Sequence, residues 1–405
     1  MAKTIFEVEI SNNSPKSYET ATTMRMPATW AEFNDAIQKA RIADARACKN
    51  ELIRIHYPGI TGGLIGTDNN LYDLNLLAQR LAALTEDQKL GMDALLKMEQ
   101  KQHSGPASLE CLINLTYNTD ICRLVPQISN HQELGAFLYE NEMLADEAIA
   151  LLDTTEEGSG FRERLLELLG EEHQEEHGGV FTSWGYAERD REVQPIYTYR
   201  PGEVAYFHRS GAPVVLAVAK GAGETAVLDL PVADAGIRQA LAAVGADTVE
   251  ECTFRCVDCL IPSLRPVIDE ALEGSSFDQV HEFARLLARK ERVWGEAEFV
   301  KYKAILEGIG CSDLQNAQHL LDEAEQYELC PQVAQTWDYA EMVFREKYPD
   351  LPEALFQTPQ AAEIGRAMLE GRAGAITEYG LLRRKDGQPL PEFRHEETQG
   401  MEMMM

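Results

Sequence analysis

The chain is poor in basic side chains, and this shortage narrows the range of possible partners. Its 405 residues include 67 acidic and 37 basic side chains, which gives a formal net charge of −30. A field of that sign repels nucleic acid and anionic membranes and attracts basic protein surfaces. We therefore expect a protein that binds neither nucleic acid nor a membrane. A simpler interpretation, that the charge only keeps the protein dispersed, stays open at this point.

Two further shortages concern the compartment. No apolar run approaches the roughly 18 residues of a membrane-spanning helix. Met1–Thr4 do not lead into the apolar core of a signal peptide, and eight cysteines are too few for a disulfide framework. We therefore expect a cytoplasmic protein with reduced cysteines and no cofactor.

The main pattern that is present is an internal duplication. Residues from about 5 to 187 recur, strongly diverged, from about 213 to 394. Leu109–Ile128 aligns with Leu314–Val333, and Met26-Pro27 aligns with Leu230-Pro231. The period of about 205 residues is far longer than the roughly 20–50 residues of a solenoid unit. The sequence therefore predicts two similar globular units in tandem.

Each repeat is predicted to be a small α/β part followed by a helical part, which is an α+β fold. Ile5–Ile10 alternates apolar and charged residues, as a half-buried strand does. Ala31–Ala43 is predicted to be a helix, with Thr29 as N-cap and Glu32 completing a capping box. The predicted divisions are 1–70 and 71–187 for the α/β and helical acidic parts of repeat one, 188–212 for a linker, 213–275 and 276–394 for the same two parts of repeat two, and 395–405 for a flexible tail.

Apolar residues recur at amphipathic helix spacing through both helical parts. In repeat one we expect helices near Leu74–Leu81 and at Thr85–Gln100, Ser108–Thr116, Gln132–Asp153 and Phe161–His177. In repeat two we expect them at Ser276–Arg289, Trp294–Glu307, Ser312–Tyr327, Thr336–Lys347 and Pro359–Leu369.

Two short patterns resemble zinc sites, and the sequence argues against both. Cys252, Cys256 and Cys259 form a CxxxCxxC cluster, but the last two align with apolar strand positions of repeat one, where a free cysteine packs as a small hydrophobe. His173 and His177 fit an inverted zinc-protease pattern inside a run rich in glutamate, and repeat two has no equivalent. We expect no metal site and no catalytic residues, and a hydrolase that uses the two histidines is the weakest alternative.

The positive signal is acidic charge concentrated late in repeat one. Thirteen acidic residues lie between positions 140 and 176, and only Arg162 and Arg164 oppose them. Four of the acidic residues recur every fourth residue along one predicted helix, whose other side we expect Leu165, Leu168 and Leu169 to bury. The candidate partner-binding residues are Glu140, Glu142, Asp146, Glu147, Asp153, Glu156, Glu157, Glu163, Glu167, Glu171, Glu172, Glu175 and Glu176, and in repeat two Asp322, Glu323, Glu325, Glu328, Asp338, Glu341, Glu346, Asp350 and Glu353.

Several short segments of repeat one occur in an order that resembles the ArdA antirestriction proteins of plasmids and conjugative elements. They are Leu74–Leu81, Cys111–Thr116, Pro126, Leu134–Leu138 and Gly179–Tyr186. Repeat two departs further from this pattern, and its membership follows mainly from the internal duplication.

The resemblance implies an elongated, curved, acidic body that mimics duplex DNA. It also implies a partner, a type I restriction–modification methyltransferase or another DNA-binding defence protein. The family typically acts as a homodimer, so the tandem chain is expected to be either a monomeric pseudo-dimer or a homodimer. An acidic adaptor for some other basic protein is the alternative.

Overall fold

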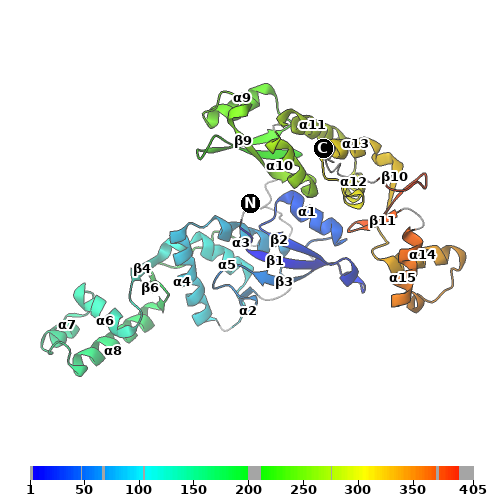
Figure 1. Ribbon diagram of the computed structural model, residues 1–405. Helices are drawn as coiled ribbons and strands as arrows, with labels where there is room; N and C mark the ends of the chain where they lie inside the picture. Colours follow the sequence, from blue (N-terminus) through cyan, green and yellow to red (C-terminus); the bar gives the residue numbers. More distant parts are fainter. Residues whose placement is uncertain are drawn as a thin grey trace, which may run out of the picture.

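The computed structural model describes residues 3–46, 48–65, 69–103, 105–198, 211–274, 276–370 and 374–391. These residues form helices and small antiparallel sheets, so the predicted α+β class is confirmed. The molecule is elongated and curved, with repeat one running toward one end and repeat two arching over its first part (Figure 1).

Each repeat opens with the same three-stranded sheet. In repeat one its strands are β1 (Phe6–Ser11), β2 (Thr22–Met26) and β3 (Lys49–Ile55), in the order β2-β1-β3; in repeat two they are β7 (Val214–Ala219), β8 (Thr225–Leu230) and β9 (Thr253–Cys259), in the order β8-β7-β9. Phe6 pairs with Met26 and Ile55, as Val214 pairs with Leu230 and Cys259. Both central strands also shift register after their second residue. The duplication therefore extends to the pairing of individual residues.

A helix follows β2 and β8 and packs against its sheet. It is α1 (Trp30–Lys39) in repeat one and α9 (Asp234–Ala243) in repeat two. The predicted capping box of α1 is present: the Thr29 hydroxyl accepts from the Glu32 backbone N–H, and the Glu32 carboxylate accepts from the Thr29 backbone N–H. These bonds satisfy two of the donors that the first turn of a helix leaves free.

A helical layer completes the main core of each repeat. In repeat one it comprises α2 (Gly62–Ile65), α3 (Leu71–Ala83), α4 (Glu86–Gln102) and α5 (Leu109–Tyr117); in repeat two it comprises α10 (Arg265–Glu273), α11 (Phe277–Glu291), α12 (Glu296–Ile309) and α13 (Leu314–Glu323). Leu74, Leu77 and Leu81, the residues that predicted the amphipathic helix, are fully buried. Tyr302 and Phe283 fill the corresponding core of repeat two.

The predicted helical parts also contain strands, which the sequence did not reveal. In repeat one these are β4 (Cys122–Pro126), β5 (Val180–Phe181) and β6 (Gly185–Arg189); in repeat two they are β10 (Tyr327–Cys330), β11 (Gly374–Thr377) and β12 (Gly380–Arg384). Each set forms a sheet in which the last strand lies between the other two. Strands of two to five residues are too short to show an alternating pattern of their own.

A helical arm is inserted in each of these second sheets. Arm one, residues 127–179, contains α6 (His131–Glu140), α7 (Asp146–Asp153) and α8 (Gly160–His177); arm two, residues 331–373, contains α14 (Thr336–Lys347) and α15 (Pro359–Glu370). The two arms lie at opposite ends of the molecule (Figure 1). The single helix expected over Gln132–Asp153 is wrong, because the chain turns between α6 and α7, where Glu142 has a φ of 54°.

The first part of the predicted linker packs on repeat one. Asn114 donates to the backbone oxygen of Tyr197 and accepts from its N–H at 2.8 and 2.7 Å. The Tyr197 hydroxyl donates to Asp73 at 2.8 Å, and Gln194 is held in the same way by Asn118. The rest of that segment, 199–210, and the predicted tail, 395–405, lie outside the described residues.

The repeats meet where α1 of repeat one packs on α12 and β11–β12 of repeat two. The Asp35 carboxylate lies 2.7 Å from the Lys303 ammonium and accepts from the Tyr379 hydroxyl at 2.7 Å. The Lys303 side chain is only 4% exposed. Burial alone would raise the pKa of Asp35, but Lys303 and Lys39 outweigh burial and lower it. Lys39 also pairs with Glu378 of repeat two. A buried ion pair therefore joins the repeats.

Candidate functional site

Arm one is built on an unusually close contact between α6 and α8. A Cβ atom on Gly135 would lie 1.9 Å from the Leu166 backbone oxygen, and one on Gly170 would lie 2.0 Å from that of His131. A side chain at either position would force the helices apart. Arm two repeats half of this device, because a Cβ on Gly365 of α15 would lie 1.8 Å from the Thr336 oxygen of α14.

This contact fixes which face of α8 is buried. Leu166 and Gly170 face α6 and are buried, whereas Leu168 is 46% exposed and Leu165 and Leu169 are half-buried. The prediction that Leu165, Leu168 and Leu169 are buried is therefore wrong for Leu168 and holds only in part for Leu165 and Leu169, which are half-buried. The prediction was based on the spacing of leucines. In the structure, Gly135 and Gly170 determine which face of α8 turns toward α6, because they allow the two helices to approach most closely.

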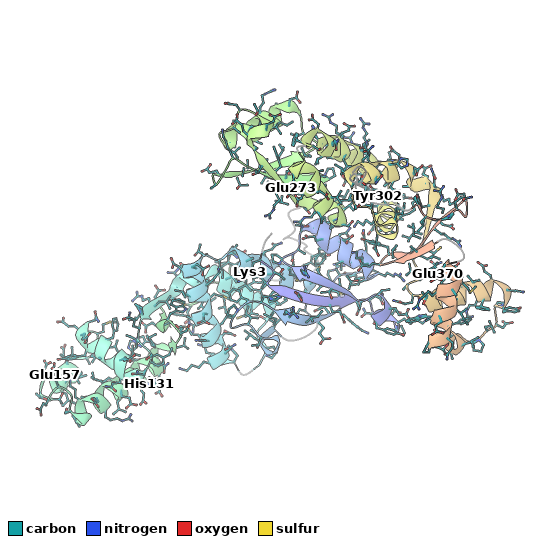
Figure 2. All side chains as sticks on the ribbon, in the orientation of Figure 1. Lys3, His131, Glu157, Glu273, Tyr302 and Glu370 are labelled. Carbon is teal, nitrogen blue, oxygen red and sulfur yellow. The ribbon has the colours of Figure 1, made fainter. Side chains whose placement is uncertain are left out.

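The thirteen predicted acidic residues of repeat one gather on arm one and face solvent. Glu167 and Glu171 are half-buried, and the other eleven are exposed: Glu140, Glu142, Asp146, Glu147, Asp153, Glu156, Glu157, Glu163, Glu172, Glu175 and Glu176. Side chains cover the whole of this arm in Figure 2, where Glu157 and His131 mark its two ends. The predicted acidic residues of repeat one thus lie together on one arm, and most of them are exposed.

These acidic groups have almost no cationic partners. Arm one carries 14 acidic and 2 basic side chains, a net charge of −12. Arg164 pairs with Glu167 at 2.5 Å, the one ion pair that the thirteen make within the described part of the chain. Arg162 is turned inward instead, where it donates to Leu152 and Thr155 and lies 4.9 Å from the Tyr139 ring centroid. The field of the arm is therefore largely uncompensated.

The predicted acidic residues of repeat two are divided between the body of the repeat and arm two, and more of them make ion pairs. Asp322, Glu323, Glu325 and Glu328 lie on α13, the following 3₁₀ helix Ala324–Gln326 and β10, in the body of the repeat. Asp338, Glu341 and Glu346 lie on α14, Asp350 on the loop after it, and Glu353 at the start of the 3₁₀ helix Glu353–Leu355. Glu328 pairs with Arg383, Glu341 with Arg345 at 2.7 Å, and Asp322 with Lys290 at 3.9 Å. Cations of the same repeat thus neutralise several of these groups.

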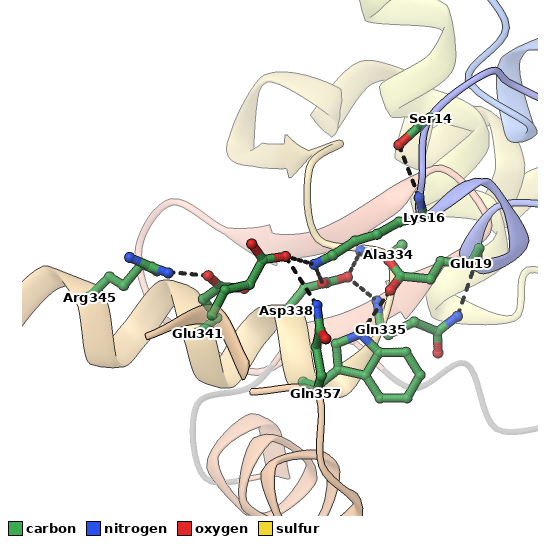
Figure 3. A network of polar contacts seen from close by, with 11 residues as sticks. Ser14, Lys16, Glu19, Ala334, Gln335, Asp338, Glu341, Arg345 and Gln357 are labelled. Carbon is green, nitrogen blue, oxygen red and sulfur yellow. Dashed lines mark hydrogen bonds and ion pairs between the residues drawn. The ribbon is translucent and has the colours of Figure 1, made fainter. Parts of the chain in front are cut away.

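Repeat one supplies another cation to arm two (Figure 3). Lys16, beside the short 3₁₀ helix Ser17–Glu19, lies 3.3 Å from Glu353 and 3.9 Å from Asp338. Asp338 also accepts from the backbone N–H groups of Ala334 and Gln335, so it caps α14. Burial, with the Asp338 charge nearby, raises the pKa of Glu19, which accepts from the indole of Trp337. Arm two is therefore held against repeat one by ion pairs of its own acidic residues. Among the thirteen predicted acidic residues of arm one, by contrast, only Glu167 makes an ion pair within the described part of the chain.

The sequence patterns that resembled zinc sites have other roles. Cys256 and Cys259 are buried in the repeat-two core, where burial raises both thiol pKa values, that of Cys259 to about 12. His173 bonds to Glu188 at 2.8 Å and stacks on His177 with ring centroids 4.0 Å apart. Within the residues described, no three potential metal-ligating side chains of His, Cys, Asp or Glu converge. Likewise, none of the described helices combines the length and apolarity needed to cross a membrane.

Comparison with protein-family models, curated proteins and solved structures finds no match to this chain. The surface itself therefore carries the functional argument. It is a projecting, closely packed arm whose carboxylates are mostly exposed and make almost no ion pairs within the described residues, and such a surface attracts a basic partner.

Proposed function

We propose that this protein is a non-enzymatic DNA mimic that acts in the cytoplasm. Its partner would be a type I restriction–modification methyltransferase or another DNA-binding defence protein, whose DNA-binding groove it occupies. The observation that carries the proposal is arm one, with a net charge of −12 and twelve exposed carboxylates. The choice of target rests on the resemblance of the repeat-one segments to the ArdA proteins.

The spacing of charge on α8 supports mimicry. Glu163, Glu167, Glu171 and Glu175 follow one another every four residues, or about 6 Å of helix rise. One strand of duplex DNA carries a phosphate about every 3.4 Å. One helical row thus provides roughly half the charge density of a strand, and the acidic residues of α6, α7 and the intervening turns add to it.

The linked repeats support a single-chain form of the inhibitor. The family that repeat one resembles typically pairs two chains, whereas here a buried ion pair joins two repeats of one chain. A covalent link holds the second unit at high effective concentration. Light scattering at low micromolar concentration should then give the mass of one chain, and a compact two-chain particle would count against this part of the proposal.

Competition against duplex DNA tests the function. A purified type I methyltransferase core would be loaded with fluorescent DNA and titrated with this protein at about 50 mM and about 200 mM salt. We expect displacement at near-stoichiometric protein, with a steep loss of affinity at the higher salt because charge pairing drives binding. No displacement at either salt would reject this target and favour the acidic adaptor.

A further inference from the structure

Arm one also exposes apolar side chains among its carboxylates. Phe161 is 63% exposed, Leu168 46%, Met143 52% and Leu151 44%. Phe161 and Leu168 are seven residues apart on α8, so they lie two turns apart on the same face. Leu168 is two residues from both Leu166 and Gly170, which places this face opposite the one that packs on α6.

Arm two buries a phenylalanine that stands at the same spacing from its glycine. A phenylalanine stands nine residues before the buried glycine of each arm: Phe161 before Gly170, and Phe356 before Gly365. Phe356 is only 3% exposed and packs beside Phe344 with ring centroids 6.2 Å apart. Arm one therefore leaves in solvent a ring that arm two uses as core.

The charges around Phe161 and Leu168 define what can cover them. Glu172 and Glu175 follow Leu168 by one and two turns on the same face, and both are exposed. Arg164 lies between Phe161 and Leu168 on that face, but it pairs with Glu167 at 2.5 Å, so the face keeps an excess of acidic charge. A second copy of the arm would bring together two surfaces of −12, and like charges at an interface oppose association. A basic partner with an apolar stripe satisfies both kinds of side chain at once.

We infer that the outer face of α8 is a docking surface for a basic amphipathic helix of the partner. Phe161 and Leu168 bury against its apolar stripe, and Glu172 and Glu175 pair with the lysines or arginines beside that stripe. The inference rests on the proposed function in one respect, namely that arm one meets a basic protein. It adds that part of the affinity comes from apolar burial, which salt does not screen.

Two synthetic helical peptides of equal positive charge test this inference without the methyltransferase. One carries a leucine stripe flanked by lysines, and the other has glutamine in place of leucine. Fluorescence anisotropy would measure their binding to the full chain, to the double variant Phe161→Ser/Leu168→Ser, and to the control Val293→Ser. Val293 is 77% exposed in repeat two, so the control removes an exposed apolar side chain outside both arms.

The expected result is a loss of about tenfold in affinity for the leucine peptide in the double variant, at low and at moderate salt. The glutamine peptide should bind the double variant and the unaltered chain alike, and the control should change neither. Equal binding of the leucine peptide to the double variant and the unaltered chain would overturn the inference while leaving the DNA mimic intact. Binding of neither peptide would overturn it and also count against a basic partner.

Sedimentation at low salt tests whether a second copy of this chain, in place of a basic helix, covers the outer face of α8. If the unaltered chain self-associates and the double variant does not, the outer face of α8 is an interface between copies of this chain, and the inference is wrong. We expect both proteins to sediment as one species of the same mass.

Discussion

The two arms share a plan but differ in how their charge is balanced. Both are helical insertions in a three-stranded sheet, and both use a buried glycine to bring two helices together. Arm one has 14 acidic and 2 basic side chains, whereas arm two has 7 and 4 and borrows Lys16 from repeat one. The comparison teaches that duplication kept the scaffold while the charges diverged, which leaves one arm free to meet a partner.

The contact between the repeats shows the same divergence. Asp35 and Lys303 pair across it. Counted from Pro27 and Pro231, the position of Asp35 corresponds to Gln239, and counted from the first residues of α4 and α12, the position of Lys303 corresponds to Asp93. The surface of repeat one equivalent to the one that holds α1 carries Trp184, which is 61% exposed, where repeat two has the buried Tyr379. The residues that hold α1 of repeat one on repeat two are therefore not repeated for the reverse contact, of α9 on repeat one.

The largest effect is expected from breaking that pair. Lys303→Met would leave Asp35 buried without its nearest cation, at a cost of about 3–5 kcal/mol. Chemical denaturation should show the loss, and small-angle scattering should show repeat two released from repeat one. Lys301→Met, two residues away on the same helix, is the matched control and should change little. Equal stability of the two variants would mean that the ion pair does not hold the repeats together.

Acid provides a milder way to weaken the same contact. The pKa of Asp35 is lower in the folded protein than in the unfolded chain, so its contribution to stability is present above the unfolded value and is lost as pH falls through the folded value. The contact should thus survive down to about pH 4 and weaken only below it. Hydrogen exchange of α1 across this range measures the effect. Loss of protection between about pH 7 and 5 would show that another group controls the contact.

A buried glycine separates the two arms experimentally. Gly170→Ala should destabilise arm one by about 1–3 kcal/mol or more, because its Cβ would clash with the His131 oxygen. Gly160→Ala lies at the start of the same helix with no atom within 4 Å of its Cβ, and it serves as the control. Hydrogen exchange should localise the loss to α6–α8 and spare α14–α15. A uniform effect on both arms would contradict their independence.

The smallest effect concerns the cation that arm two borrows. Lys16→Gln should cost no more than about 1 kcal/mol, because its pairs with Asp338 and Glu353 are partly exposed. This variant removes a cation that neutralises arm two, and so makes the charge balance of arm two more like that of arm one. Exchange protection of α14 should fall slightly, while binding through arm one stays unchanged. A marked change in partner binding would place arm two in the interface.

How far the sequence could predict this structure depends on the length of its patterns. The Thr29 capping box and the Leu74–Leu81 helix were predictable because each is a local pattern with one physical meaning. The short strands β4–β6 were not, because two to five residues carry no periodicity. The exposure of Leu168 was also missed, since it depends on contacts of Gly135 and Gly170 that only the folded arm reveals. These two glycines, 35 residues apart, are the only feature of the sequence that could have indicated the close contact between α6 and α8.

The candidate site divides in the same way. The acidic run of repeat one was visible in sequence, and charges without nearby cations stay on the surface. For repeat two the sequence did not reveal the ion pairs, because Lys16 and Arg383 are distant in sequence from the acidic residues with which they pair. A run of acidic residues therefore predicts an acidic surface only where the fold brings no basic side chain from a distant part of the sequence next to it.

The most direct test of the central claim compares equal neutralisation of the two repeats. One variant would change Glu163, Glu171, Glu172, Glu175 and Glu176 to glutamine, and the other would change the exposed Asp322, Glu325, Glu346, Asp350 and Glu353 to the matching amides. Competition against duplex DNA for the methyltransferase core would be measured for both. The account predicts that the first variant loses about tenfold or more in affinity with a shallower salt dependence, while the second stays within about twofold. Equal losses in the two variants would contradict it, because the charges of arm one would then matter no more for binding than the same number of charges in repeat two.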